Sequence, residues 1–103
     1  MIKVSVLYPN GDDINFDIDY YCNKHVPMVI ATLGDALKAG AVDYGIAGGI
    51  PGAKAPFIAM SHLTFESVEA FQGAFGPKAG ELLADIPNFT NSQPQIQISE
   101  IKI

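Results

Sequence analysis

Four stretches of the chain carry apolar residues at every second position, the period that is typical of β-strands. The first covers residues 2–8 and ends at the turn sequence Pro9-Asn10-Gly11. The second covers residues 42–46, and the third, which has the strongest pattern, covers residues 57–65. The fourth runs from residue 95 to residue 103, with isoleucine at positions 96, 98, 101 and 103. The pattern therefore predicts four strands.

Apolar residues recur at steps of three and four in two other segments, which predicts helices. The first helix begins after Asp17 or Asp19, either of which can cap a helix N-terminus. It runs to about Leu37. Because Pro27 lies inside it, we expect a kink there or an end to its first part near Val26. The second helix begins at residues 66–67 and is interrupted at residues 76–77, which are Gly-Pro.

The order strand, helix, strand, strand, helix, strand is that of the ferredoxin-like βαββαβ arrangement. We expect an α+β fold in which both helices cover one face of a four-stranded antiparallel sheet. Residues 48–56, GGIPGAKAP, are rich in Gly and Pro and predict a flexible loop that forms the rim or lid of a pocket. No repeat or linker divides the chain, so residues 1–103 are expected to form one domain.

The predicted strands are apolar on both faces, whereas a sheet with one face in water should alternate more cleanly. Composition agrees with this, because 49% of the 103 residues are apolar and only 17% are charged. We therefore expect a homodimer in which the open sheet face is covered by a second copy of the chain. The positions expected on that face are Met60, Val6 and Ile98, or their neighbours in the pleat.

Charge and cysteine content exclude several classes of protein. The formal net charge is −5 and the six basic residues are all lysines spread along the chain, so a nucleic-acid partner is not expected. The chain has one cysteine, no evident signal peptide and no apolar run long enough to cross a membrane. We expect a cytoplasmic protein without membrane attachment. Two histidines without closely spaced ligand partners make a poor metal site, and no metal is expected.

Residues 16–28, FDIDYYCNKHVPM, resemble the signature of the EthD family, F-D-x-x-Y-Y-x-x-K-H-x-P-M/L. Residues 2–9 are similar to the first strand of that family, and residues 60–71 resemble its third strand and second helix. The resemblance implies a ferredoxin-like monomer that dimerises through its sheet into an α/β barrel. The family is named after a protein of a bacterial ethyl tert-butyl ether degradation cluster that works beside a cytochrome P450 system. Relatives on this fold include cofactor-free monooxygenases, muconolactone isomerases, haem-degrading enzymes and polyketide cyclases.

His25 is the main candidate for a functional residue. Tyr21 precedes it by four positions and Met28 follows it by three, so all three share one face of the predicted helix. An imidazole on the wall of an apolar pocket can take a proton from an acidic carbon or hydroxyl. The alternative is that His25 only donates to a carbonyl freed by the kink at Pro27. We take His25 and Tyr21 as candidate catalytic residues.

The candidate substrate-binding residues are Tyr8, Met28, Met60 and His62. His62 can point either into the same cavity as His25 or into the dimer interface. Two functions stay open. One is a cofactor-independent oxygenase, isomerase or cyclase that acts on a small hydrophobic or aromatic compound, with His25 as the general base. The other is a non-catalytic accessory protein that holds such a ligand or supports a partner oxidoreductase. A cavity beside His25 would favour the enzyme.

Overall fold

The computed structural model describes all of residues 1–103, and its elements follow the predicted order. The strands are β1 (Ile2–Pro9), β2 (Ala39–Tyr44), β3 (Phe57–Phe65) and β4 (Gln95–Glu100). The helices are α1 (Ile18–Tyr20), α2 (Val26–Leu33), α3 (Val68–Phe75) and α4 (Ala79–Ala84). A π-helical turn, Tyr21–His25, joins α1 to α2, and short 3₁₀ turns follow α2, α3 and α4.

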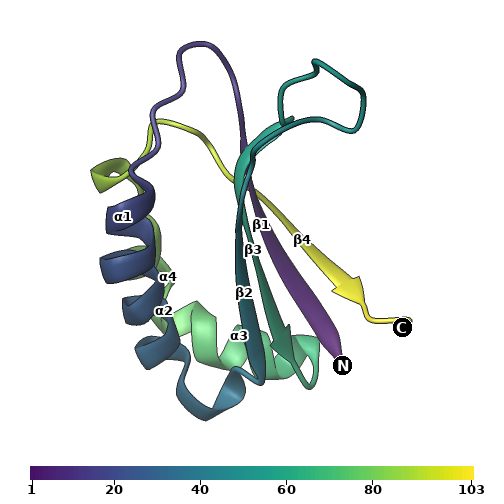
Figure 1. Cartoon of the computed structure of the whole chain (residues 1–103). Coiled ribbons are helices and arrows are strands. Elements are labelled where there is room, and N and C mark those ends of the chain that lie inside the picture. Colours follow the sequence, from purple (N-terminus) through teal and green to yellow (C-terminus); the bar gives the residue numbers. More distant parts are fainter.

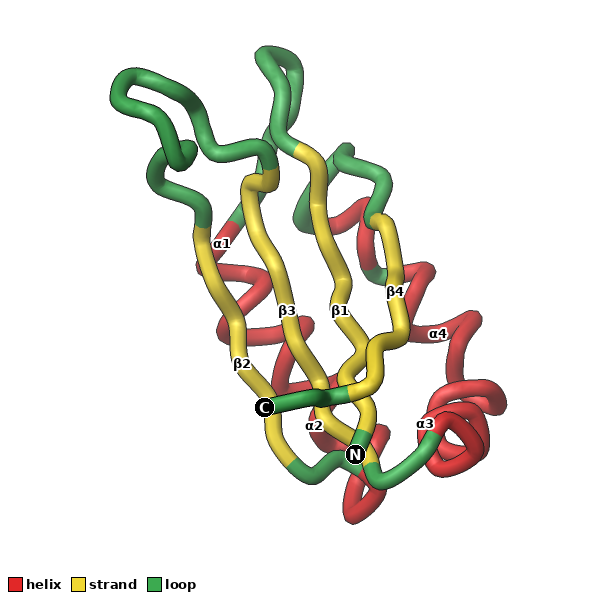
Figure 2. The backbone as a smooth tube through the Cα atoms, turned by 90° about the vertical axis from the view of Figure 1, so that its right-hand side faces the viewer, coloured by secondary structure: helices red, strands yellow, loops and turns green.

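The four strands form one antiparallel sheet in the order β2-β3-β1-β4. All helices lie on one side of this sheet (Figure 1). Figure 2 shows the opposite side, where the four strands lie in front of the helices and only the C-terminal segment after β4 crosses in front of their lower ends. This confirms the α+β, ferredoxin-like fold. No helix combines the length and the apolar character needed to cross a membrane.

The first helix begins at Asp17, whose side chain accepts a hydrogen bond of 3.0 Å from the backbone N–H of Tyr20. The helix continues through Pro27 to Leu33. Proline is tolerated there because the preceding turn is widened: the N–H of Val26 donates to the carbonyl of Tyr21, five residues back. Such π-helical turns are rare and frequently lie at functional sites. Instead of the expected kink at Pro27 or break near Val26, the structure has one widened turn, and the helix then continues.

Two strand boundaries differ from the prediction. Strand β2 begins at Ala39 and ends at Tyr44, so it lies earlier in the chain than residues 42–46. At Gly45 the backbone passes so close to β3 that a Cβ would lie 2.3 Å from the carbonyl oxygen of Phe57, and the N–H of Gly45 donates to the carbonyl of Ile58. The chain leaves the sheet there and forms the long loop 45–56. Strand β4 ends at Glu100, so Ile101 is not part of the sheet.

The strand register corrects the expected location of the surplus apolar residues. Val6 lies opposite Ser61, and Ile98 lies opposite Val4, so Val6 and Ile98 are on the side that faces the helices. Met60 is on the open side. Neighbouring positions along a strand point to opposite faces, and the sequence pattern alone does not say which face the helices cover. The open face is mixed: it carries Lys3, Ser5, Leu7, Asp43, Met60 and His62.

Two separate groups of buried residues form the core between sheet and helices. The first consists of Tyr8, Tyr21, Ala59 and Phe89. The second consists of Val4, Leu33 and Phe65. The first group lies beside the π-helical turn, and the second lies beside the end of α2.

Candidate functional site

A cavity of about 360 Å³ lies between the helices and the sheet and borders both core groups. Of its 24 lining residues, 19 are hydrophobic, so it is suited to an apolar molecule. Its volume is at the lower end of the range of roughly 300–1,000 Å³ that is usual for small-molecule sites. The side chains with polar atoms that line it are Tyr8, Tyr21, His25, Lys38 and Ser61.

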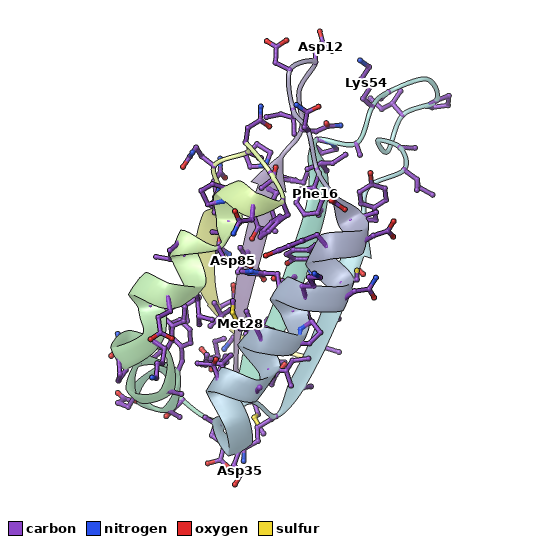
Figure 3. All side chains as sticks on the ribbon, turned by 90° about the vertical axis from the view of Figure 1, so that its left-hand side faces the viewer. Asp12, Phe16, Met28, Asp35, Lys54 and Asp85 are labelled. Atoms are coloured by element: carbon purple, nitrogen blue, oxygen red, sulfur yellow. The ribbon has the colours of Figure 1, made fainter.

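His25 lies on the cavity wall at the end of the π-helical turn, and its side chain is buried. Its Nδ1 atom is 2.8 Å from Oδ2 of Asp85, which follows α4 on the helix side of the molecule (Figure 3). The imidazole ring stacks on Tyr21, with ring centres 5.6 Å apart, and contacts Phe89 at 4.6 Å. Packing and the carboxylate therefore hold the ring in one orientation.

Asp85 is itself held by two further side chains. The hydroxyl of Tyr20 donates to its Oδ1 at 2.8 Å, and the side-chain amide of Asn88 donates to the same atom at 2.9 Å. The hydrogen bond from Asn88 lowers the pKa of Asp85, and His25 and Tyr20 act in the same direction. Partial burial opposes this shift. Asp85 is therefore a carboxylate at neutral pH, and the hydrogen bond to this carboxylate raises the pKa of Tyr20.

The contact with Asp85 sets the tautomer of His25. A carboxylate only accepts hydrogen bonds, so Nδ1 of the neutral imidazole must carry the hydrogen. The other ring nitrogen, Nε2, then has a free lone pair. No protein group hydrogen-bonds to it, and the structure leaves no fully buried side-chain nitrogen or oxygen unpaired, so Nε2 is accessible. The imidazole can thus accept a proton at Nε2 from a molecule in the cavity.

The hydroxyl groups of Tyr8, Tyr21 and Ser61 lie on the same part of the cavity wall as His25. Tyr8 and Tyr21 are in edge-to-face contact, with ring centres 5.7 Å apart. Burial raises the pKa of Tyr8, and neighbouring Tyr21 adds to the shift. Burial also raises the pKa of Tyr21, although its interactions with Ser61 and Tyr8 act in the opposite direction. Both phenols therefore keep their protons at neutral pH and can donate hydrogen bonds.

The structure brings together three of the six predicted site residues: His25, Tyr21 and Tyr8 all line the cavity. Met28, Met60 and His62 do not line it. His62 is on the open face of the sheet, where Nδ1 lies 2.8 Å from Oγ of Ser5 and Nε2 lies 3.6 Å from a carboxylate oxygen of Asp43. It thus points away from His25.

The loop 45–56 does not act as the expected rim or lid, because none of its residues lines the cavity. It extends from the end of the sheet beside the loop that follows β1, and Lys54 contacts Asp12 there at 3.0 Å (Figure 3). The backbone of Asn10 also donates to the carbonyl of Pro56. The two loops support each other at a distance from the cavity.

Sequence reasoning did not single out Asp85 or Ser61. Asp85 is the only charged residue in the run LLADIPNF, residues 82–89, and an isolated carboxylate among apolar residues was a usable signal. Ser61 is the one polar residue on the apolar face of β3, between Ala59 and Leu63. No three His, Cys, Asp or Glu side chains come together to hold a metal ion.

Comparison with known proteins agrees with the fold and the motif. The chain has 42% sequence identity and a TM-score of 0.95 to an EthD-like protein from Ralstonia eutropha JMP134, over 99% of this chain and 92% of that one. An ethyl tert-butyl ether degradation (EthD) family protein from Bacillus halodurans C-125 has 21% identity and a TM-score of 0.69, over 98% of each chain.

A dimeric ferredoxin-like protein of unknown function from Thermobifida fusca YX shares the fold at 16% identity and a TM-score of 0.53, over 97% of this chain and 90% of that one. No curated protein matches the sequence. The model of the EthD domain matches residues 15–93, which hold the π-helical turn, His25 and Asp85. The chain therefore belongs to the EthD domain family.

Proposed function

We propose that this protein binds a small hydrophobic or aromatic compound in the cavity and that His25 transfers a proton to or from it. The observation that carries the proposal is the pairing of His25 with Asp85 at 2.8 Å on the wall of an apolar cavity. A histidine held by a carboxylate at one nitrogen, with the other nitrogen free, is suited to general acid–base chemistry.

The proposed step is the removal of a proton from an acidic carbon or hydroxyl of the ligand by Nε2 of His25. Asp85 stabilises the imidazolium that forms, because its carboxylate lies against Nδ1. The electron pair left on the ligand is delocalised onto an oxygen, and Tyr8 and Tyr21 can donate hydrogen bonds to that oxygen. Cofactor-independent oxygenases, isomerases and cyclases can all begin with such a step.

The cavity favours this function over a purely accessory role. A protein that only supports a partner needs no internal cavity, and one that only holds a ligand needs no accessible base, whereas here Tyr8, Tyr21 and Ser61 lie with His25 on the cavity wall. The alternative interpretation of His25, a donor to a backbone carbonyl freed by Pro27, has no support in the contacts, since Nδ1 bonds to Asp85.

We also propose that the protein is a homodimer through its open sheet face. Leu7 and Met60 are only partly buried there, and no helix or strand of the same chain covers this face (Figure 2). Ferredoxin-like proteins of the same fold from Thermobifida fusca and Bacteroides fragilis are described as dimeric. A second copy would remove these side chains from water.

Exchange of hydrogen for deuterium at the acidic carbon of β-tetralone, an apolar ketone, tests the proton transfer. We expect the protein to accelerate exchange in D₂O, followed by NMR, and His25→Asn to reduce the acceleration by about 10²-fold or more. His62→Asn is the matched control, because His62 lies outside the cavity. No acceleration by the wild type, or equal rates in wild type and His25→Asn, would show that His25 is not the base.

A further inference from the structure

The cavity has a polar end and an apolar end. Tyr8, Tyr21, His25 and Ser61 form the polar end, beside the π-helical turn. Along the sheet, Ser61 is followed on the helix side by Leu63, and β1 places Val4 opposite Leu63. Along the helix, His25 is followed by Val29 and Leu33. A long molecule would therefore meet the hydroxyl and imidazole groups only with one end.

Donors and an acceptor lie together at the polar end. The two tyrosine hydroxyls keep their protons and can donate, and Nε2 of the neutral imidazole of His25 can accept. A hydroxyl group matches this set, because its hydrogen can bond to Nε2 while its oxygen accepts from a tyrosine. A methyl ether lacks the hydrogen and would leave Nε2 without a partner.

The polar end carries no fixed positive charge. Lys38 is the only lysine that lines the cavity. Its backbone amide donates to the carbonyl of Thr64, so it lies beyond Leu63, at the apolar end. The negative charge of Asp85 is also near His25. A ligand that enters as an anion would thus lose its hydration without gaining a cationic partner, which is unfavourable.

We propose that the ligand is a neutral molecule with one weakly acidic hydroxyl group, of the phenol or enol type, on an alkyl or aryl body. The hydroxyl binds between Nε2 of His25 and the tyrosine hydroxyls, and the body extends toward Leu33 and Phe71. This proposal names the ligand class of the site described above and rests on the function proposed for that site. The side chains of Ile30, Leu83 and Ile96, which also line the cavity, are exposed, so the cavity is open to solvent beside them.

Three probes with the same pentyl chain test the ligand class by isothermal titration calorimetry. They are para-pentylphenol, para-pentylanisole and para-pentylbenzoate. We expect the phenol to bind about tenfold or more tightly than the anisole, the difference expected for one buried hydrogen bond. We expect the benzoate to bind more weakly than the phenol. Equal binding of phenol and anisole, tighter binding of benzoate or no binding of the phenol would overturn the proposal.

Tyrosine variants locate the hydroxyl group of the probe. Tyr21→Phe and Tyr8→Phe should each lower affinity for the phenol severalfold without changing affinity for the anisole. Tyr44→Phe is the matched control, since Tyr44 is 47% exposed and does not line the cavity. Circular dichroism checks that each variant is folded. If Tyr21→Phe and Tyr8→Phe leave the phenol affinity unchanged, as the control does, the proposed position of the phenol hydroxyl is wrong.

These binding measurements are independent of turnover. If the phenol binds as described but β-tetralone exchange is absent, the ligand class stands and the proton-transfer function fails. If exchange depends on His25 but the phenol shows no preference over the anisole, the function stands and the ligand class fails.

Discussion

Oδ2 of Asp85 lies 2.8 Å from Nδ1 of His25, although 60 positions separate the two residues in the sequence. His25 ends a π-helical turn in the first helical segment, and Asp85 directly follows α4 in the second. The two segments lie side by side on the sheet, and this contact joins them beside the cavity (Figure 3). The pair is therefore both a link between helices and the polar centre of the candidate site.

Replacing Asp85 by Asn should impair proton transfer while the cavity keeps its shape. An amide can donate to Nδ1 and so favour the tautomer with hydrogen on Nε2, which cannot act as a base. We expect β-tetralone exchange to fall by roughly 10–100-fold, the range seen when a residue that orients another is lost. The histidine ¹⁵N spectrum should show the change of tautomer. Asp43→Asn, on the open sheet face, is the matched control and should alter neither measurement.

The lowered pKa of Asp85 predicts a dependence of stability on acid. The pKa of this carboxyl is lower in the folded state than in the unfolded state, so its contribution is present above the ordinary value of about 3.9. That contribution is lost as the pH falls through the folded-state pKa. The urea midpoint of the wild type should therefore drop more between neutral pH and pH of about 3 than that of Asp85→Asn. Parallel decreases in both proteins would contradict the assignment.

Phe89 should contribute strongly to stability because it joins the aromatic groups around the site. It is 3% exposed, and its ring lies 4.6 Å from His25 and 5.0 Å from Tyr21 between ring centres. We expect Phe89→Ala to lower the free energy of unfolding by about 3–5 kcal/mol, as for other buried aromatic residues. Leu83→Ala, at a side chain that is 45% exposed, should cost much less. Urea denaturation monitored by circular dichroism measures both.

Filling the cavity should abolish ligand binding while the fold is retained. Val42 lies opposite Ser61 on the helix side of the sheet and lines the cavity. The larger ring in Val42→Phe can extend into this space, so we expect para-pentylphenol affinity to fall by about tenfold or more. The melting temperature should change little, since the cavity has room for the added atoms. Unchanged affinity would place the ligand elsewhere.

The proposed dimer predicts a mass of about twice 11.0 kDa in light scattering after size exclusion. Met60→Asp places a charge at the centre of the open sheet face and should shift the protein toward the monomer. Ala53→Asp, in the loop 45–56 and away from this face, should leave the mass unchanged. A monomeric wild type would refute the dimer.

Local patterns were sufficient for much of the fold. The period of two predicted β3 over residues 57–65, and the structure has the same bounds. Asp17 was recognised as a possible helix cap, and its side chain accepts the capping hydrogen bond. The spacing of Tyr21 and His25 placed them on one helix face, and their rings stack. These features depend on neighbours within a few residues, which the sequence displays directly.

Only the tertiary structure decided which face of the sheet the helices cover and which distant side chains meet. Periodicity showed that Met60 and His62 share a face of β3, but the register and the helix packing placed that face away from His25. Asp85 and Ser61 joined the site in the same way, through helix packing and strand pairing. The physical reason is that periodicity relates side chains within one element, whereas contacts between elements depend on burying apolar surface from the whole chain.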